Sequence, residues 1–327
     1  MTFNKTNKNS REKRKQQWLS LLIFLLFPLF FFGGPDYYSP RSFKNFWNVG
    51  HVVFFALLSY KLLTNSSFLK NKSVHYKFIF CLFIAGALGF TIEYLQSFFG
   101  QDVDINDVWR DMLGASIGFF LSPIALNKRT KIWALLILTV LLIFHAVPWF
   151  FELADEVNAK RQFPVLSDFE SDIEITRWSG DAKKSISDEF VFTGKHSLRV
   201  DMSTEKYSGV ALSYFPRDWT GYQNLVFEIF SLDDELDITV RINDQLHEQG
   251  EQLYTDRFNR KLALHKGWNT INIDLQDVVN APATRLMDLS RVSNLGVFVT
   301  EQPAPKTIYL DSVKLLKPIW TPLRSLV

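Results

Sequence analysis

The chain has 327 residues, of which 47% are hydrophobic and 15% aromatic, and its formal net charge is only +2. Its near-zero mean hydropathy averages a very apolar N-terminal half with an ordinary C-terminal half, so we expect two domains. Basic residues stand beside apolar runs and form no patch on the polar half, which excludes a nucleic-acid partner. The single cysteine, Cys81, excludes an intrachain disulfide.

A basic tail of residues 1–17 precedes five apolar segments, which predict a helical membrane domain of about five transmembrane helices over residues 18–151. The segments cover residues 18–32, 46–63, 78–99, 105–126 and 132–151. No small-residue cleavage site follows the first segment, so we expect it to be retained. Lys and Arg gather in the tail and in the second and fourth connections, whereas the third connection carries Asp102 and Asp104. The positive-inside rule therefore predicts a cytoplasmic N-terminus and an extracytoplasmic C-terminal domain.

The third and fourth segments form a hairpin that places carboxylates inside a membrane. Helical spacings of three and four put polar and small residues on one face of each segment. These residues are Gly86, Gly89, Glu93 and Gln96 on the first segment and Asp104, Asp107, Asp111, Gly114 and Gly118 on the second. The two last glycines form the pattern that lets membrane helices approach closely. A carboxylate facing lipid costs about 2.5 to 3.5 kcal/mol, so these acids must face protein or trapped water.

Several titratable groups are predicted to lie at one depth, in the outer half of the bilayer, from a rise of about 1.5 Å per helical residue. They are His51, Glu93, Asp107, Asp111 and His145. One interpretation is an intramembrane polar site with catalytic candidates Glu93, Asp107, Asp111 and His51. The other interpretation is structural, because His51 can be an ordinary packing histidine and Arg110 can neutralise Asp107.

Residues 18–126 carry a set of polar residues in fixed order that resembles the VanZ-like membrane proteins. The residues are His51 with Phe54, Glu93-x-x-Gln96, the Gly100-Gln101 turn, Asp107-Val-x-x-Asp111-x-x-Gly114-Ala and Gly118. Gln101 stands where the family usually has Arg, and Asp111 where it usually has Asn. The resemblance implies a multi-pass protein of the bacterial cytoplasmic (inner) membrane and supplies no substrate.

After a linker of residues 152–165, short runs with period-two alternation predict an all-β sandwich over residues 166–318, followed by a tail of residues 319–327. The predicted strands are Ser197–Met202, Gly209–Tyr214, Leu225–Phe230, Asp237–Ile242, Lys261–Leu264, Asn269–Leu275, Leu295–Val299 and Thr307–Leu315. Two stretches, Leu275–Val279 and Leu286–Ser290, predict short helical turns. The fold class is thus an α-helical membrane domain followed by an all-β jelly-roll sandwich.

This half resembles the galactose-binding-like jelly rolls, which include carbohydrate-binding modules. The resemblance rests on Asp168-Phe-Glu170, Gly194-Lys-His-Ser-Leu-Arg199, Tyr207-Ser-Gly-Val210, Asp218-Trp-Thr-Gly-Tyr222, Gly267-Trp-Asn-x-Ile-x-Ile-x-Leu275 and Ile308-Tyr-Leu-Asp311. It implies a structural calcium ion beside Glu170 and Asp311, with backbone oxygens of the Gly194–Lys195 turn completing the cage. The alternative is that both carboxylates only bond backbone groups at the ends of strands.

Aromatic and polar residues of the sandwich suit a sugar-binding face, because pyranose rings stack on aromatic planes while polar groups bond hydroxyls. The ligand-binding candidates are Tyr207, Arg241, Asn243, Tyr254 and Asp256. The polar stretches Arg241-Ile-Asn243-Asp244 and Tyr254-x-Asp256-Arg257-x-Asn259 are expected on adjacent strands and could form a ligand surface. Trp178 and Trp219 are further aromatic candidates, although Trp219, Tyr222 and Trp268 are expected in the core. No nucleophile with a base and no Cys/His zinc spacing stands out in this half.

Three functions therefore remain open, of which a sensor that couples sugar binding outside to helix packing ranks last. The first is a cell-envelope protein, in contact with membrane lipid, that displays a carbohydrate-binding module and binds an envelope glycan or glycolipid. The second is a membrane enzyme or transporter-like protein that acts on a lipid-linked envelope precursor through the intramembrane acids.

Overall fold

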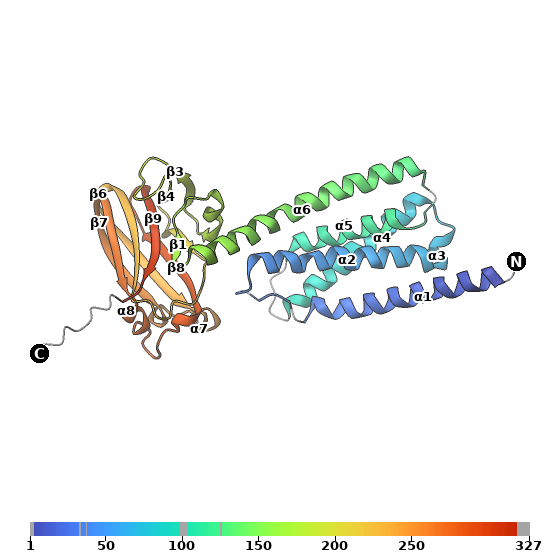
Figure 1. Ribbon diagram of the computed structural model, residues 1–327, viewed down its shortest axis with the longest axis horizontal. Helices are drawn as coiled ribbons and strands as arrows, with labels where there is room; N and C mark the ends of the chain where they lie inside the picture. The colour runs from blue at the N-terminus through green and yellow to red at the C-terminus, as the bar shows by residue number, and fades with distance from the viewer. Residues whose placement is uncertain (1–2, 33, 37, 99–103, 125, 319–327) are drawn as a thin grey trace, which may run out of the picture. The chain divides into compact units, whose positions relative to one another are not determined.

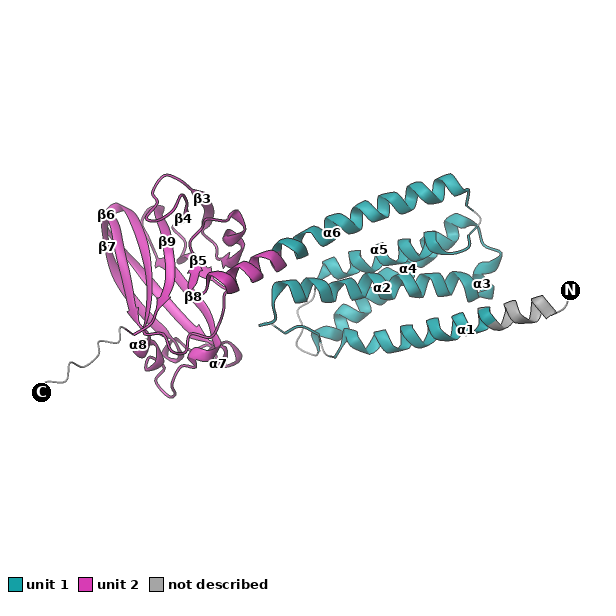
Figure 2. Cartoon of the chain, viewed as in Figure 1, with its two compact units in different colours: residues 1–151 teal, residues 152–327 magenta. Residues whose placement is uncertain are grey.

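The computed structural model describes residues 3–318 except 33, 37, 99–103 and 125 (Figure 1). The Gly100-Gln101 turn and the tail of residues 319–327 lie outside the described residues. The chain divides into two compact units, residues 1–151 and 152–327 (Figure 2). The first unit is helical and the second is built on antiparallel strands, which confirms the predicted fold class.

The helical unit contains five long helices with short helical pieces between them. The elements are α1 (Phe3–Leu26), η1 (Phe27–Phe30), α2 (Arg41–Asn65), α3 (Ser67–Lys70), α4 (Val74–Ser97), α5 (Ile105–Leu121) and α6 (Lys128–Gln162). Among the described residues, α2, α4 and α6 are long and apolar enough to cross a membrane. The 17-residue α5 ends at Leu121, five residues before the predicted end, and α6 continues as a helix through most of the predicted linker.

Large apolar side chains of this unit face outward. Phe83, Trp109 and Phe144 are 68%, 66% and 71% exposed, and none of the most apolar stretch of α6 is buried. A protein surrounded by water rarely exposes a contiguous apolar surface of this kind. The pattern indicates a membrane protein.

Close contact between α2 and α5 depends on the two glycines of α5. A Cβ atom added to Gly114 would overlap the backbone of Val52, and one added to Gly118 would overlap the backbone of Ala56. The predicted close approach of membrane helices is therefore present, and the partner helix is α2. A small aromatic-rich core packs beside this contact. Its buried members are Phe30, Phe54, Phe55, Ala85, Ile92 and Ala115.

The second unit is a curled antiparallel sheet whose two halves pack face to face. Its strands are β1 (Val165–Ser167), β2 (Trp178–Ser179), β3 (Lys183–Ser187), β4 (Ser197–Met202), β5 (Tyr207–Leu212), β6 (Asn224–Asp244), β7 (Phe258–Asp274), β8 (Val292–Thr300) and β9 (Lys306–Leu316). They follow the order β2-β5-β8-β6-β9-β4-β3, while β1 pairs with β9 and β7 with β6. Short helical pieces connect them: η2 (Asp172–Arg177), α7 (Gln245–Gln249), η3 (Tyr254–Asp256), α8 (Leu275–Val279) and η4 (Leu289–Arg291).

The long strand β6 belongs to both halves of the sheet. Its first part pairs with β9 and its last part with β8, and it pairs with β7 on both sides of a register shift between Ser231 and Glu235. Four predicted strands are therefore two long ones, because the irregularity at Ser231–Glu235 bends the hairpin without ending it. Alternate residues of β6, such as Phe227 and Val240, lie in the core between the halves.

The structure shows which of the predicted aromatic residues lie in the core of the second unit. Trp219 is fully buried, as expected for a core residue, while Tyr222 packs against the core from a partly buried position. The expectation that Trp178 is available to a sugar is wrong. Trp178 is 2% exposed and its indole N–H donates to the Ser167 hydroxyl at 3.1 Å, so the buried polar atom is satisfied inside the protein.

Candidate functional site

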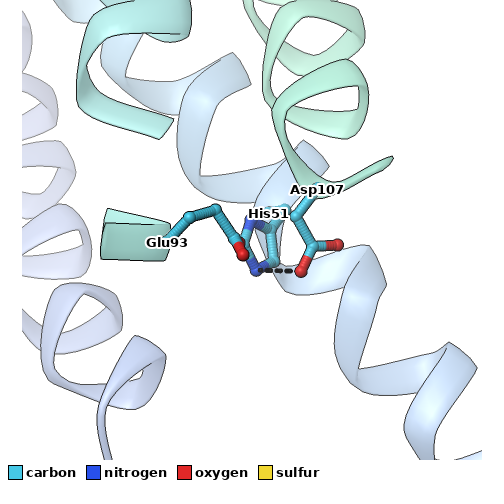
Figure 3. Close-up of side chains that lie close together, drawn as sticks. All are labelled: His51, Glu93 and Asp107. Carbon is cyan, nitrogen blue, oxygen red and sulfur yellow. Dashed lines mark ion pairs between the residues drawn. The ribbon is translucent and has the colours of Figure 1, made fainter. Parts of the chain in front are cut away.

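Four polar residues from three helices meet inside the helical unit. His51 comes from α2, Glu93 from α4, and Asp107 and Asp111 from α5, and each is at most 9% exposed. The His51 Nε2 atom lies 3.5 Å from Asp107 Oδ2 (Figure 3), and its Nδ1 atom lies 2.9 Å from Asp111 Oδ1. The structure thus brings together all four residues that the sequence named as an intramembrane polar site. We call this set the acid–histidine cluster.

Arg110 lies at the edge of the acid–histidine cluster. Its guanidinium forms ion pairs with Asp107 and with Asp104, the latter at 3.1 Å. Its Nε–H donates to His145 Nε2 at 3.0 Å, so His145 lies behind Arg110 and not in the cluster. The predicted neutralisation of Asp107 is therefore present, and Arg110 is shared between Asp107 and Asp104.

Hydrogen bonds hold some of the cluster's oxygen atoms and leave others open. Glu93 Oε2 accepts the backbone N–H of Asp104 at 2.8 Å. Glu93 Oε1 and Asp111 Oδ2 are buried and have no hydrogen-bond partner among the described residues. A buried acceptor without a donor costs about 1–3 kcal/mol, more for a charged group. The cluster can therefore take up protons or a cation.

A second candidate site lies on the outer face of the half-sheet formed by β5, β8 and the end of β6. A groove of about 380 Å³ runs across these strands. It is lined by Gly180, Asp181, Tyr207, Ser208, Gly209, Val210, Ala211, Arg241, Arg257, Gly296 and Phe298. Strand register explains the grouping, because Gly209 pairs with Phe298 and Gly296 pairs with both Ala211 and Arg241.

Aromatic rings and guanidinium groups line this groove side by side. Tyr207 is 57% exposed and its ring centroid lies 6.0 Å from that of Phe298. The guanidinium of Arg241 lies 5.9 Å from the Phe298 ring, and the side chain passes over Gly296, which has no Cβ in its way. A ring that stacks on a pyranose beside donors for hydroxyl groups is what sugar binding requires.

Two family models match the two units. Residues 1–127 match VanZ/LLP1, and residues 167–317 match Carbohydrate binding domain 30. The N-terminal part is VanZ-like and the C-terminal part is a carbohydrate-binding-module fold. Both predicted resemblances are confirmed. No curated protein sequence matches the chain.

Solved structures similar to this chain include carbohydrate-binding modules and agarases. An exo-β-agarase aligns at 19% identity and a TM-score of 0.39, over 47% of this chain and 25% of its own length. A family 11 carbohydrate-binding module from Clostridium thermocellum, in complex with a β-1,3-1,4-mixed-linked tetrasaccharide, aligns at 15% identity and a TM-score of 0.38. The alignment covers 48% of this chain and 96% of the module. The family 30 module of a Clostridium thermocellum cellulosomal cellulase aligns at 16% identity and a TM-score of 0.35, over 44% of this chain and 93% of its own length. The chain thus spans a quarter of the agarase.

Of the ligand-binding candidates in the carbohydrate-binding part, Tyr207 and Arg241 line the groove and the others do not. Asn243 is 1% exposed and donates to Glu248 Oε1 at 2.7 Å. Asp256 pairs with Arg285 at 2.7 Å, and the hydrogen bond from Arg285 lowers the pKa of Asp256. Tyr254 is 68% exposed on η3, outside the residues that line the groove.

Sequence reasoning missed Phe298 as a groove residue, whereas it placed Arg257 in a polar stretch beside Arg241. Phe298 stands two residues after Gly296 on a predicted strand, so alternation alone puts both on one face. Arg257 immediately precedes β7, and only the pairing of Arg241 with Asn259 brings this stretch beside the groove. Alternation therefore offered a signal for Phe298 that was not used, and the clustering of polar residues was the signal for Arg257.

The predicted calcium residues hold one loop of the carbohydrate-binding part. Glu170 Oε1 accepts the backbone N–H groups of Lys195 and His196 at 2.7 and 3.0 Å. Asp311 Oδ2 likewise accepts two N–H groups, from Phe192 and Thr193, at 2.7 and 3.0 Å. These donors lower the pKa of Glu170, whereas burial raises the pKa of Asp311. Both carboxylates thus bond backbone groups, as the alternative without calcium predicts. A calcium ion beside these residues stays a prediction.

Proposed function

We propose that this protein is a membrane protein of the bacterial cell envelope whose carbohydrate-binding part binds an envelope glycan or glycolipid. The groove across β5, β8 and β6 carries the proposal. It combines the exposed ring of Tyr207 with the guanidinium groups of Arg241 and Arg257 in a unit that matches a carbohydrate-binding family. Arginine is suited to acidic or hydroxyl-rich sugars because its planar fork offers five donors.

The helical unit supports a membrane location for this binding activity. Its three long apolar helices and outward-facing aromatic residues fit a lipid environment. The Lys/Arg-rich tail and the acidic third connection support a cytoplasmic N-terminus and an extracytoplasmic groove. In that orientation the protein lies in the cytoplasmic membrane and meets its ligand outside the cell interior.

A second candidate function is chemistry or transport on a lipid-linked envelope precursor. The acid–histidine cluster favours it, because Glu93 Oε1 and Asp111 Oδ2 are buried acceptors without donors among the described residues. Ionisable groups kept inside a membrane at such cost are typical of functional sites. The acids would then bind or move protons during work on the precursor.

Glycan binding is tested with the purified full chain in detergent, titrated with peptidoglycan fragments, lipopolysaccharide sugars and mixed-linked β-glucans. Tyr207→Ala should weaken binding at least tenfold, about 1.4 kcal/mol, because the ring that stacks on the sugar is lost. Phe192→Ala is the matched comparison, since Phe192 is an exposed aromatic residue and does not line the groove. Full binding by Tyr207→Ala would exclude the groove as the glycan site.

A further inference from the structure

One nitrogen and two carboxylate oxygens of the acid–histidine cluster converge on a single point. His51, Glu93 and Asp107 each offer a ligand atom, and these atoms lie within 4.8 Å of one another. All three residues are buried, so water does not compete freely for the position. We propose that His51, Glu93 and Asp107 bind one divalent transition-metal ion of the zinc type, with Asp111 orienting His51.

Hydrogen bonding divides each side chain into a held atom and an open atom. Glu93 Oε2 is held by the backbone N–H of Asp104, and Oε1 is buried without a partner among the described residues. Asp107 Oδ1 pairs with Arg110, and Oδ2 faces His51 Nε2. Figure 3 shows the carboxylates of Glu93 and Asp107 directed toward His51. The open atoms are thus His51 Nε2, Asp107 Oδ2 and Glu93 Oε1.

Asp111 prepares His51 as a metal ligand. Its Oδ1 atom lies 2.9 Å from His51 Nδ1, so a proton on Nδ1 leaves the Nε2 lone pair free for a metal. A carboxylate behind a ligating histidine fixes the tautomer and the orientation of the ring in metal sites. Gly89 makes room for this carboxylate, because a Cβ at that position would overlap Asp111 Oδ2. Asp111 is therefore a positioning residue.

The balance of charge also favours a cation. Among the described residues, the carboxylates of Glu93, Asp104, Asp107 and Asp111 share one guanidinium, that of Arg110, which pairs with Asp104 and Asp107; this leaves three excess negative charges when all are ionised. Buried like charges repel and are poorly solvated. A divalent ion cancels two of the three charges and supplies the partner that Glu93 Oε1 lacks.

The ligand set selects the kind of metal. Calcium and magnesium take oxygen ligands, whereas one imidazole with two carboxylates suits zinc and its first-row neighbours. Zinc bonds of about 2.0–2.2 Å in a tetrahedral site place ligand atoms roughly 3.3–3.6 Å apart. The 3.5 Å between His51 Nε2 and Asp107 Oδ2 already matches this spacing. The Glu93 oxygen, which lies within 4.8 Å of both, has to move closer on binding. Three protein ligands leave a fourth position for a water molecule or a substrate.

The test uses the full chain in detergent, stripped with a chelator and then titrated with Zn²⁺ against a chromophoric competitor. We expect one Zn²⁺ per chain, a rise in the melting temperature, and visible absorption bands when Co²⁺ replaces Zn²⁺. Asp111→Asn should weaken Zn²⁺ binding about 10- to 100-fold, because it loosens a ligand without removing one. Glu93→Gln and His51→Ala should weaken it more than Asp111→Asn does.

Two matched variants control for nonspecific metal binding. His75→Ala removes an exposed histidine of α4, and Asp36→Asn removes an exposed acid before α2; both should bind Zn²⁺ as the wild type does. Glu93→Gln decides the matter if His51→Ala does not fold, since the amide oxygen can still accept the Asp104 N–H. A folded wild type that binds no Zn²⁺, or unchanged binding in Glu93→Gln, would overturn the proposal.

Discussion

Two clusters of buried charge, one in each unit, differ in how well their polar atoms are satisfied. In the carbohydrate-binding part, Arg177 is fully buried and bonds Asp155 at 2.8 Å, the carbonyl oxygen of Leu166 at 2.9 Å, and Glu174 at 3.7 Å. Glu174 Oε2 also accepts three donors, from Ser167, Asp168 and Phe169. No side-chain atom of Arg177, Asp155 or Glu174 is among the unsatisfied ones in the described part of the chain.

The acid–histidine cluster of the VanZ-like part has too few donors for its acceptors. Glu93 Oε1 and Asp111 Oδ2 lack partners among the described residues, although both side chains are almost completely buried. A structural network is expected to satisfy its own atoms, whereas a binding site keeps atoms available for a ligand. We therefore interpret Arg177 and its partners as a stabilising network and the acid–histidine cluster as the proposed binding site.

The largest expected effect follows from breaking the saturated network. Arg177→Met leaves Asp155 and Glu174 as buried charges without their cation, which should destabilise the unit by about 3–5 kcal/mol. Urea unfolding of the full chain, followed by tryptophan fluorescence, measures the loss. Arg199→Met is the control: its ion pairs with Asp201 and Glu189 are substantially exposed and worth about 1 kcal/mol at most. Equal losses in both variants would contradict the structural assignment.

The opposite outcome is expected for the acid–histidine cluster. Glu93→Gln with Asp107→Asn keeps shape and removes two buried negative charges, so stability in chelator should stay within about 1 kcal/mol of wild type. Any resistance or envelope phenotype should be lost, because the acids are no longer available for protons or cations. Expression level, thermal unfolding and the phenotype are measured together. A wild-type phenotype in this double variant would end the enzymatic candidate and leave glycan binding.

A smaller effect concerns the loop that Glu170 and Asp311 hold. If calcium binds beside these carboxylates, millimolar calcium should raise the melting temperature of the wild type by a few degrees. Glu170→Ala and Asp311→Ala should each remove that rise. Scanning calorimetry with and without calcium measures it, and a wild type that does not respond to calcium has no such site.

The smallest effect is a pH dependence. Backbone N–H donors hold the pKa of Glu170 below its ordinary value of 4.5, so the folded state favours the ionised carboxylate. The resulting stability is present above pH 4.5 and is lost as pH falls through the lower folded pKa. Glu170→Gln should flatten the acid side of the melting-temperature profile, whereas Glu205→Gln, at an exposed acid, should leave it unchanged. Parallel profiles for all three proteins would contradict this assignment.

Local periodicity predicted much of the fold. Strand β4 and helix α8 have the predicted bounds, since alternation and turn signals are read within a few residues. Strands β6 and β7 are each predicted as two shorter strands, because a bend inside a strand resembles a turn in sequence. Strands β1, β2 and β3 were not predicted, as β1 and β2 have three residues or fewer and depend on distant partners.

The candidate sites were predictable to different degrees. Helical spacing placed Glu93, Asp107 and Asp111 on inward faces, because a membrane forces carboxylates toward protein. The pairing of His51 Nδ1 with Asp111 depends on how α2 packs against α5, and spacing within one helix carries no such information. No local sequence pattern indicated the buried network around Arg177, because its partners Asp155 and Leu166 lie 22 and 11 residues away.

The position of β9 has a consequence for synthesis. This last strand of the sheet lies between β6 and β4 and also pairs with β1, so it is the centre of one half. Until residues 306–316 leave the ribosome, β6 and β4 each present an unpaired edge. The hairpin of β6 and β7 joins neighbouring segments and can form early, whereas Leu198 must wait for Leu310. A ribosome-bound chain that stops before β9 therefore exposes open strand edges to other chains, and the half-sheet of β4, β6 and β9 closes only when its central strand arrives.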